Sequence, residues 1–189
     1  MEENKYYTFQ TVNITSKDDI KKPNPSITFC AEMGVQIPSK RDEDAGYDIY
    51  TIEDGVVLKP LETRGFRTGL RSSFSPNFWV EIKERGSTGA AGLSVRSGVI
   101  DSGFRGEWMI MLTNVNRYDV EFSSAVDKVT KIYSRWNKKK VIKLIYPISK
   151  AIAQAVVVPL PLMDVKVVTT VDELGASERG DSGWGASGK

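Results

Sequence analysis

Residues 98–106 read Gly-Val-Ile-Asp-Ser-Gly-Phe-Arg-Gly and place one carboxylate, Asp101, in a glycine-rich turn beside Phe104. The apolar pair before Asp101 favours a short strand, so the segment predicts a β-hairpin. Such a hairpin can present bare backbone amides and carbonyls to the flat edge of a ligand, while the carboxylate holds a water molecule. An aspartate in a turn is also a common structural feature, so this motif alone does not establish a catalytic site.

A second segment combines a cation with small residues. Residues 84–89 read Glu-Arg-Gly-Ser-Thr-Gly, in which Arg85 and the free amides around it suit phosphate oxygens. An ordinary surface turn has the same composition. Three further segments carry polar groups that could join a site: residues 44–48 (Asp-Ala-Gly-Tyr-Asp), Gln154 within an apolar stretch, and the glycine-rich residues 177–189.

The composition excludes several kinds of chemistry. Histidine is absent and Cys30 is the only cysteine, which excludes histidine-dependent nucleophiles, His-ligated zinc, internal disulfides and multi-cysteine metal sites. The 26 basic and 24 acidic residues leave a net charge of +2, so we expect no stable nucleic-acid binding. Any chemistry must come from carboxylates, Arg, Lys, hydroxyls and backbone amides.

The elements that must position these groups are short strands. A chain of 189 residues with 40% apolar residues fits one domain with a core, and many short β-rich segments separated by Gly and Pro predict an all-β sandwich or barrel-like fold. A weaker edge-strand pattern covers residues 6–14. The expected strands cover residues 26–33, 56–59, 66–70, 78–83, 107–113, 141–146 and 152–158.

Residues 123–140 break this pattern with apolar residues at helical spacing. These residues are Val126, Val129, Ile132, Tyr133 and Trp136. They predict an inserted amphipathic helix, either packed with a solvated basic face or serving as a docking site for a protein partner. We place the insertion at about residues 117–147, within a β domain of residues 26–176 that follows an extension of residues 1–25.

The chain lacks the patterns of a membrane protein. It has no run of about eighteen apolar residues, and its first residues lack the apolar stretch of a signal peptide. We therefore expect a soluble, cytoplasmic protein that does not enter a membrane.

Taken in order, the five polar segments resemble the five motifs of the trimeric dUTP pyrophosphatase (dUTPase) family. Residues 45–49 match motif one (A-G-x-D-[LI]), and residues 98–106 match motif three (G-V-I-D-x-x-[YF]-R-G). Residues 150–154 loosely match motif four, and residues 178–188 match motif five with one extra residue. For motif two, usually P-R-S-[GS], the family's spacing selects Arg85 rather than Arg96, with Gly86 at the usual Ser position and Ser87 as its substitute.

This resemblance implies a jelly-roll-like β fold assembled as a homotrimer with shared active sites. It implies Mg²⁺-dependent hydrolysis of dUTP to dUMP and pyrophosphate, which controls the dUTP level and supplies dUMP for thymidylate synthesis. Asp101 would orient the attacking water, and Phe104 would pack under the deoxyribose, where the family usually has Tyr. The hairpin backbone that would read the uracil edge belongs to Gly98, Val99 and Ile100.

The resemblance also assigns the phosphate and lid contacts. Residues 177–189 would form a mobile lid over the site, and Asp48 would reach Mg²⁺ through water. Groups expected on the phosphates are Arg85, Gly86, Ser87, Gln154 and, at the γ end, Arg179. Trp184 would stack on the uracil, and Gly185, Ala186 and Ser187 would complete the lid contacts.

Two alternatives remain open at this point. The related dCTP deaminases carry a Glu in the strand after the hairpin, and the corresponding position here is Met111, which cannot transfer a proton. The other alternative is a catalytically idle member that acts by binding a partner through residues 117–147 or the 1–25 extension. Pyrophosphate release from dUTP distinguishes both from a dUTPase.

Overall fold

The structure is a computed structural model that describes residues 8–13 and 25–177 of the chain. Strands dominate the described residues, which confirms the expected all-β class. The strands are β1 Thr8–Asn13, β2 Ser26–Ala31, β3 Tyr47–Ile49, β4 Val56–Leu58, β5 Thr63–Arg67, β6 Leu70–Phe74, β7 Phe78–Lys83, β8 Leu93–Arg96, β9 Val99–Ile100, β10 Met109–Asn114, β11 Asp119–Ser123, β12 Thr130–Tyr133, β13 Val141–Pro147 and β14 Ala153–Pro159. The helices are α1 Gly86–Ala90 and a 3₁₀ turn, η1 Asp172–Leu174.

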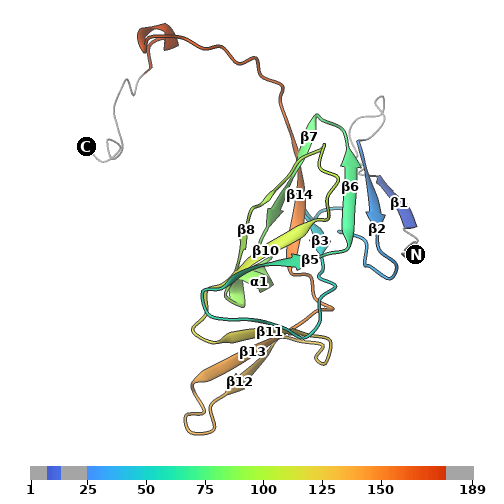
Figure 1. The fold of residues 1–189 in the computed structure, drawn as a ribbon, viewed down its shortest axis with the longest axis vertical. Helices are drawn as coiled ribbons and strands as arrows, with labels where there is room; N and C mark the ends of the chain where they lie inside the picture. The colour runs from blue at the N-terminus through green and yellow to red at the C-terminus, as the bar shows by residue number, and fades with distance from the viewer. Residues whose placement is uncertain (1–7, 14–24, 178–189) are drawn as a thin grey trace, which may run out of the picture.

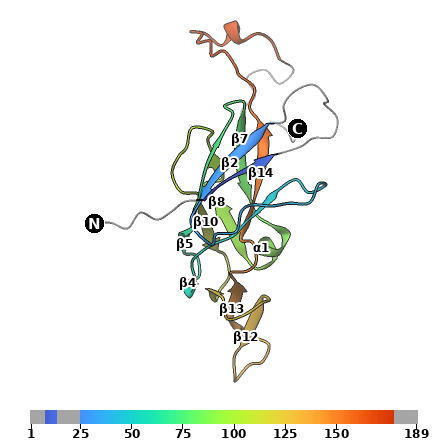
Figure 2. The same ribbon diagram turned by 90° about the vertical axis from the view of Figure 1, so that its right-hand side faces the viewer.

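The strands form four small sheets around one core (Figures 1 and 2). Their orders are β1-β2-β6, β5-β10-β8, β12-β13-β11-β4 and β3-β14-β7-β9. Aromatic side chains join the sheets: the rings of Phe66 and Phe122 lie 4.4 Å apart, and Trp108 meets Phe29 edge-on at 5.3 Å. Burial of such rings, together with the aliphatic residues around them, is the main stabilisation of a fold built from short strands.

Most of the expected strands lie where the β-rich segments between Gly and Pro residues predicted them. One was wrong: residues 66–70 span a turn between β5 and β6, because Gly69 adopts a φ of +67° that ends the strand conformation. The edge strand expected over residues 6–14 corresponds to β1, which pairs antiparallel with β2.

The helix expected over residues 123–140 was also wrong. The segment instead contributes the end of β11, a turn and β12, which pairs antiparallel with β13. The apolar residues at helical spacing do not share a buried face, since Tyr133 is 48% and Trp136 is 99% exposed. Pairing with the β-branched strand β13 (Val-Ile-Lys-Leu-Ile-Tyr-Pro) overrides the helical pattern.

The expected insertion of residues 117–147 contains part of the core. Val120 and Phe122 of β11 and Leu144 and Tyr146 of β13 are buried. Strands β11 and β13 are parallel neighbours. Strand β12 comes between them in the sequence, runs in the opposite direction and pairs with the other edge of β13. The part that projects from the body is therefore the hairpin made by β12, the start of β13 and their connection (Figure 1).

An extended arm leaves the body after β14, at the opposite end of the molecule from the β12–β13 hairpin (Figures 1 and 2). Pro159 and Pro161 end the sheet pairing, because proline cannot donate a ladder hydrogen bond. The arm exposes apolar side chains, among them Leu162 at 85%, Val165 at 88% and Val167 at 90%. In the described residues, neither helix has the length and apolar character needed to cross a bilayer.

Candidate functional site

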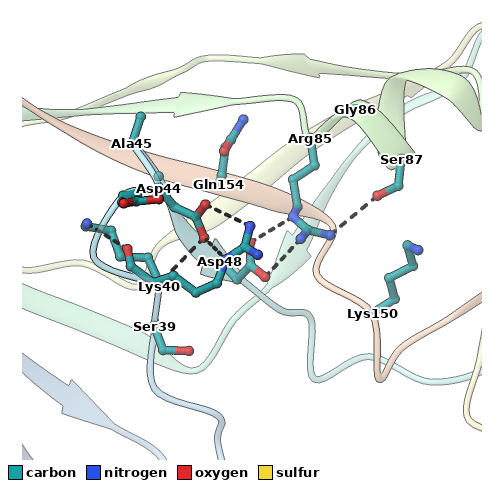
Figure 3. A pocket seen from close by; sticks show the side chains of 13 residues that line it. Ser39, Lys40, Asp44, Ala45, Asp48, Arg85, Gly86, Ser87, Lys150 and Gln154 are labelled. Atoms are coloured by element: carbon teal, nitrogen blue, oxygen red, sulfur yellow. Dashed lines mark hydrogen bonds and ion pairs between the residues drawn. The ribbon is translucent and has the colours of Figure 1, made fainter.

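A cleft of about 870 Å³ gathers three of the polar segments picked out in the sequence. Its walls come from the loop that leads into β3, the junction between β7 and α1, and β14 (Figure 3). The lining residues are Ser39, Lys40, Arg41, Glu43, Asp44, Ala45, Gly46, Asp48, Arg85, Gly86, Ser87, Lys150 and Gln154. All five candidate residues from motifs one, two and four therefore lie in one cavity.

Arg85 and Asp48 form a two-point ion pair at the centre of this cleft (Figure 3). Arg85 Nε lies 2.8 Å from Asp48 Oδ1, and Arg85 Nη2 donates to Asp48 Oδ2 at 3.0 Å. The guanidinium also donates to Ser87 Oγ at 3.4 Å. Because both side chains are 28% exposed, the pair fixes the guanidinium in place while leaving it accessible to an anion.

Gln154 lies between the segment that carries Asp48 and the segment that carries Arg85. In β14 it is in register with Asp48 of β3 on one side and with Lys83 of β7 on the other. Its Nε2 donates to the Glu84 carbonyl at 2.8 Å. A Cβ at Gly46 would come within 2.6 Å of Gln154 Oε1, so the glycine of motif one leaves the space that this amide occupies.

Glu84 fastens the turn that presents Arg85. Its Oε1 accepts hydrogen bonds from the Val95 amide at 2.8 Å and from Ser94 Oγ at 3.2 Å, which tie the end of β7 to β8. Burial raises the pKa of the Glu84 carboxyl, but backbone and Ser94 hydrogen bonds, with the nearby Lys83 charge, outweigh burial and lower the pKa overall. Glu84 is thus held as a carboxylate that positions Arg85 without reaching the cleft.

The motif-three hairpin lies on the other edge of β7. Strand β9 pairs with β7 through Val99 and Ile100, and a Cβ at Gly98 would lie 2.8 Å from the Ile82 carbonyl oxygen. The Phe104 ring covers Gly106 closely enough that a Cβ there would lie 2.3 Å from it, and the ring remains 42% exposed. Asp101 is exposed in the turn between them.

The hairpin residues do not line the cleft. Ile100 pairs with Val80 near the start of β7, whereas Arg85 follows the end of that strand. At about 3.3 Å per residue, Asp101 and Arg85 lie roughly 15–20 Å apart within one chain. The structure thus separates the candidate residues into a cleft group and a hairpin group. The remaining candidates, Arg179, Trp184, Gly185, Ala186 and Ser187, lie outside the described residues.

Sequence reasoning missed two cations of the cleft, Lys40 and Arg41, and gave no site role to a third, Lys150, which opens motif four. Arg41 pairs with Asp44 at 2.8 Å, and Lys40 Nζ donates to the carbonyls of Arg41 and Asp42. The signal available was the Lys-Arg pair just before motif one and the Lys that opens motif four. With Arg85 they bring four cations to the cleft, against the three carboxylates of Glu43, Asp44 and Asp48. Lys and Arg side chains suit a polyanion such as a triphosphate.

Comparison with known proteins points in the same direction. A model of the dUTPase family matches residues 34–133, which is 100 of the 189 residues. The deoxyuridine 5′-triphosphate nucleotidohydrolase of Nautilia profundicola is 33% identical over 152 residues, covering 78% of this chain and 86% of that protein. The Pol polyprotein of caprine arthritis encephalitis virus is 34% identical over 92 residues, and this match spans only 8% of the polyprotein.

A solved structure extends the likeness to the fold. The dUTPase of Staphylococcus bacteriophage 80alpha, solved with dUPNHPP, is 24% identical and has a TM-score of 0.62, covering 96% of this chain and 99% of that one. The likeness confirms the predicted jelly-roll-like class. The family model and the Nautilia relative, together with the motifs in order along the chain, show that this chain belongs to the dUTPase family.

Proposed function

We propose that this protein hydrolyses dUTP to dUMP and pyrophosphate, which lowers the dUTP level and supplies dUMP for thymidylate synthesis in the cytoplasm. The observation that carries the proposal is the Arg85–Asp48 pair in a polar cleft that also holds Lys40, Arg41 and Lys150, in a chain that presents Asp101 on a glycine-rich hairpin. In this reading the cleft holds the phosphates and the hairpin holds the base and sugar.

The reaction follows from these positions. Water attacks the α-phosphorus, Asp101 accepts its proton, and the bond from the α-phosphorus to the oxygen bridging to the β-phosphate breaks. Arg85, Ser87 and Gln154 hold the phosphates and stabilise the charge that develops on the leaving pyrophosphate. The Phe104 ring packs against the deoxyribose and excludes a 2′-hydroxyl, while the backbone of residues 98–100 reads the uracil edge.

The donor groups of the cleft fit a Mg²⁺ ion that binds mainly through substrate. Both Asp48 oxygens accept from Arg85, and no three carboxylate, thiol or imidazole groups gather as a metal cage in the described part of the chain. Mg²⁺ commonly keeps several waters and binds through substrate phosphates, so Asp48 would accept a hydrogen bond from a metal-bound water. When bound, Mg²⁺ supplies neutralisation of the triphosphate charge.

A shared site in a homotrimer is part of the proposal. Asp101 and Arg85 are too far apart in one chain to hold the same nucleotide, so the hairpin of one subunit must face the cleft of another. The apolar arm after β14 supports this, because side chains such as Val165 and Val167 are left to pack on a neighbouring subunit. The arm would also carry residues 177–189, with Arg179 and Trp184, to that neighbour's site as a lid.

The two alternatives have less support. Deamination of dCTP would need a carboxylate at position 111, where β10 carries Met111. A purely partner-binding role leaves the ion pair in the cleft and the Asp101 hairpin without a purpose. Both predict no pyrophosphate release from dUTP.

A mixing experiment tests both the activity and the shared site. Wild type should release pyrophosphate from dUTP with Mg²⁺ and far more slowly with EDTA. The variants Asp101→Asn and Arg85→Ala should each be about a thousandfold slower.

The two inactive variants are then mixed in equal amounts, dissociated and reassembled. The mixture should recover about a quarter of wild-type activity, because random trimers then contain sites with both residues intact. Recovery only at the level of the separate variants would rule out sites shared between hairpin and cleft. No pyrophosphate from wild type would rule out the activity itself.

A further inference from the structure

The connection between β12 and β13 forms a strongly basic, aromatic surface that the proposed activity does not use. We call residues 128–140 the basic tip. They contain six cationic and no acidic residues, and they lie at the end of the body opposite the C-terminal arm (Figures 1 and 2). The cations are Lys128, Lys131, Arg135, Lys138, Lys139 and Lys140.

These cations are accessible to a ligand. All six side chains are exposed, and none forms an ion pair with any carboxylate of the described residues. Among the described residues, other cations near the hairpin do form ion pairs, as Lys59 does with Asp119 and Lys143 with Glu121. Unpaired cations this close in sequence repel one another, and a polyanion that displaces their counterions relieves the repulsion.

Aromatic rings lie among the cations. Trp136 is 99% exposed and Tyr133 is 48% exposed. Hydrogen bonds order the turn that carries Trp136: the Ser134 amide donates to the Lys140 carbonyl at 2.9 Å, and Ser134 Oγ accepts from the amides of Trp136 and Asn137. The indole is therefore held out from the body on a defined turn, with both faces open.

A planar ring among unpaired cations matches one class of partner best. Single-stranded nucleic acid offers bases that stack on aromatic side chains and phosphates that pair with Lys and Arg. A second copy of this chain is disfavoured, because it would bring six cations against six. We propose that the basic tip binds single-stranded nucleic acid, with a base stacked on Trp136 and the neighbouring phosphates on the cations.

This inference replaces the expectation drawn from the net charge of the whole chain. A value of +2 averages over the carboxylates of the body, whereas binding responds to the charge within a Debye length of the ligand. The basic tip itself carries six cations, and the carboxylate nearest to it along the chain is that of Asp127, beside Lys128. The inference does not depend on the proposed hydrolysis, because the basic tip shares no residue with the cleft or the hairpin of residues 98–106.

The test measures fluorescence anisotropy of a labelled oligothymidine of about 20 nucleotides with the full chain. We expect Trp136→Ala to weaken binding about five- to hundredfold, and Trp136→Phe, which keeps a ring, to weaken it much less. Replacing residues 134–140 with Asn-Gly, which removes Trp136 and four cations, should abolish binding. Met33→Ala, at another exposed apolar side chain, is the matched control and should bind as wild type does.

The salt dependence of the affinity and competition by other ligands complete the test. Affinity for the oligonucleotide should fall at least tenfold between about 50 and about 200 mM NaCl, and a duplex of the same length should bind more weakly because its bases are already stacked. A non-hydrolysable dUTP analogue should not compete. Absence of oligothymidine binding at low salt would overturn the proposal. So would an affinity for the duplex or for polyglutamate equal to that for oligothymidine, or an oligothymidine affinity that does not change with Trp136→Ala. Hydrolysis of dUTP by the Trp136 variants should equal wild type.

Discussion

At Gly98 the motif-three hairpin meets β7 with no space for a side chain. The Ile82 amide donates to the Gly98 carbonyl at 2.7 Å, and an added Cβ would lie 2.8 Å from the Ile82 carbonyl oxygen. That oxygen belongs to the backbone of a central strand and cannot swing away as a flexible side chain would. The glycine therefore sets how closely residues 98–100, the segment proposed to read the uracil edge, lie against the sheet.

We predict that Gly98→Ala lowers the free energy of unfolding by about 1–3 kcal/mol and weakens dUTP binding. The methyl group must push β9 away from β7 and lengthen the hydrogen bond between them. Denaturant unfolding and nucleotide titration measure the two effects. Gly103→Ala is the matched control in the same hairpin, because its Cβ would meet nothing within 4 Å. Equal stability losses for the two variants would contradict this account.

Glu84 makes the attachment of the Arg85 turn dependent on pH. Its pKa is lowered in the folded chain, so its contribution to stability is complete above the ordinary value of 4.5 and is lost as the pH falls through the lowered pKa. We predict that wild type loses stability between about pH 5 and pH 3 more steeply than Glu84→Gln does. Thermal unfolding across this range is the measurement. Parallel curves for the two proteins would show that Glu84 titrates alike in the folded and unfolded chains.

For individual residues, the spacing between the family's motifs identified those that line the cleft. Spacing selected Arg85 over Arg96, and in the structure Arg85 lies in the cleft while Arg96, on β8, donates to Thr113. Lys40 and Arg41 were missed because they precede β3 in an irregular loop, where no periodicity predicts the direction of a side chain. Lys40 and Arg41 reach the cleft because Ser39, which precedes them, forms an isolated antiparallel β-bridge with Asp48. The local sequence pattern does not show this contact.

Among the elements, the three strands from β11 to β13 act as one crossover unit. Because β11 and β13 run parallel, no tight turn can join them, and β12 supplies the return path. The sequence predicted the β-rich segments that Gly or Pro residues bound, such as β7 and β14. It failed at residues 123–140 because the helical spacing is a local pattern, whereas β12 is stabilised by pairing with β13, which the local pattern does not show.

This topology predicts which parts of the insertion can be removed. Replacing residues 134–140 with Asn-Gly joins Tyr133 to Val141, which already pair, so the protein should keep its melting temperature within a few degrees and its dUTP hydrolysis. Replacing residues 118–146 with a short turn removes buried Phe122, Leu144 and Tyr146, at about 2–5 kcal/mol each, and should leave no folded protein. Circular dichroism and calorimetry distinguish the two. A folded product from the longer deletion would show that β11 and β13 lie outside the core.

For the whole molecule, the arm after β14 is the feature that most favours the proposed assembly of several chains. An exposed row of Leu and Val is costly in water, and burying each such side chain contributes about 1.5–3 kcal/mol. Val165 and Val167 alternate along an extended backbone, as in a strand whose one face packs on a partner.

We predict that Val165→Asp combined with Val167→Asp shifts the proposed trimer toward monomer and removes most of the proposed dUTP hydrolysis. In the proposed trimer these two valines are buried between subunits, so charges in their place would oppose assembly. Sedimentation velocity gives the oligomeric state and pyrophosphate release gives the activity. Deleting residues 180–189 is the matched control: it should lower turnover and leave the trimer intact. A double variant that stays trimeric and active would show that the arm does not hold the subunits together.

The pairing of β1 with β2 carries a consequence for colloidal behaviour. Strand β1 covers the outer edge of β2 along its whole length, from Thr8 opposite Ala31 to Asn13 opposite Ser26. A chain shortened to begin at Pro25 would keep every segment that resembles a dUTPase motif, yet it would display a row of unpaired backbone amides and carbonyls at a sheet edge. Such an edge is a template for the strand of another molecule. The shortened chain should therefore form thioflavin-positive aggregates during storage, while a chain that begins at Tyr7 stays dispersed.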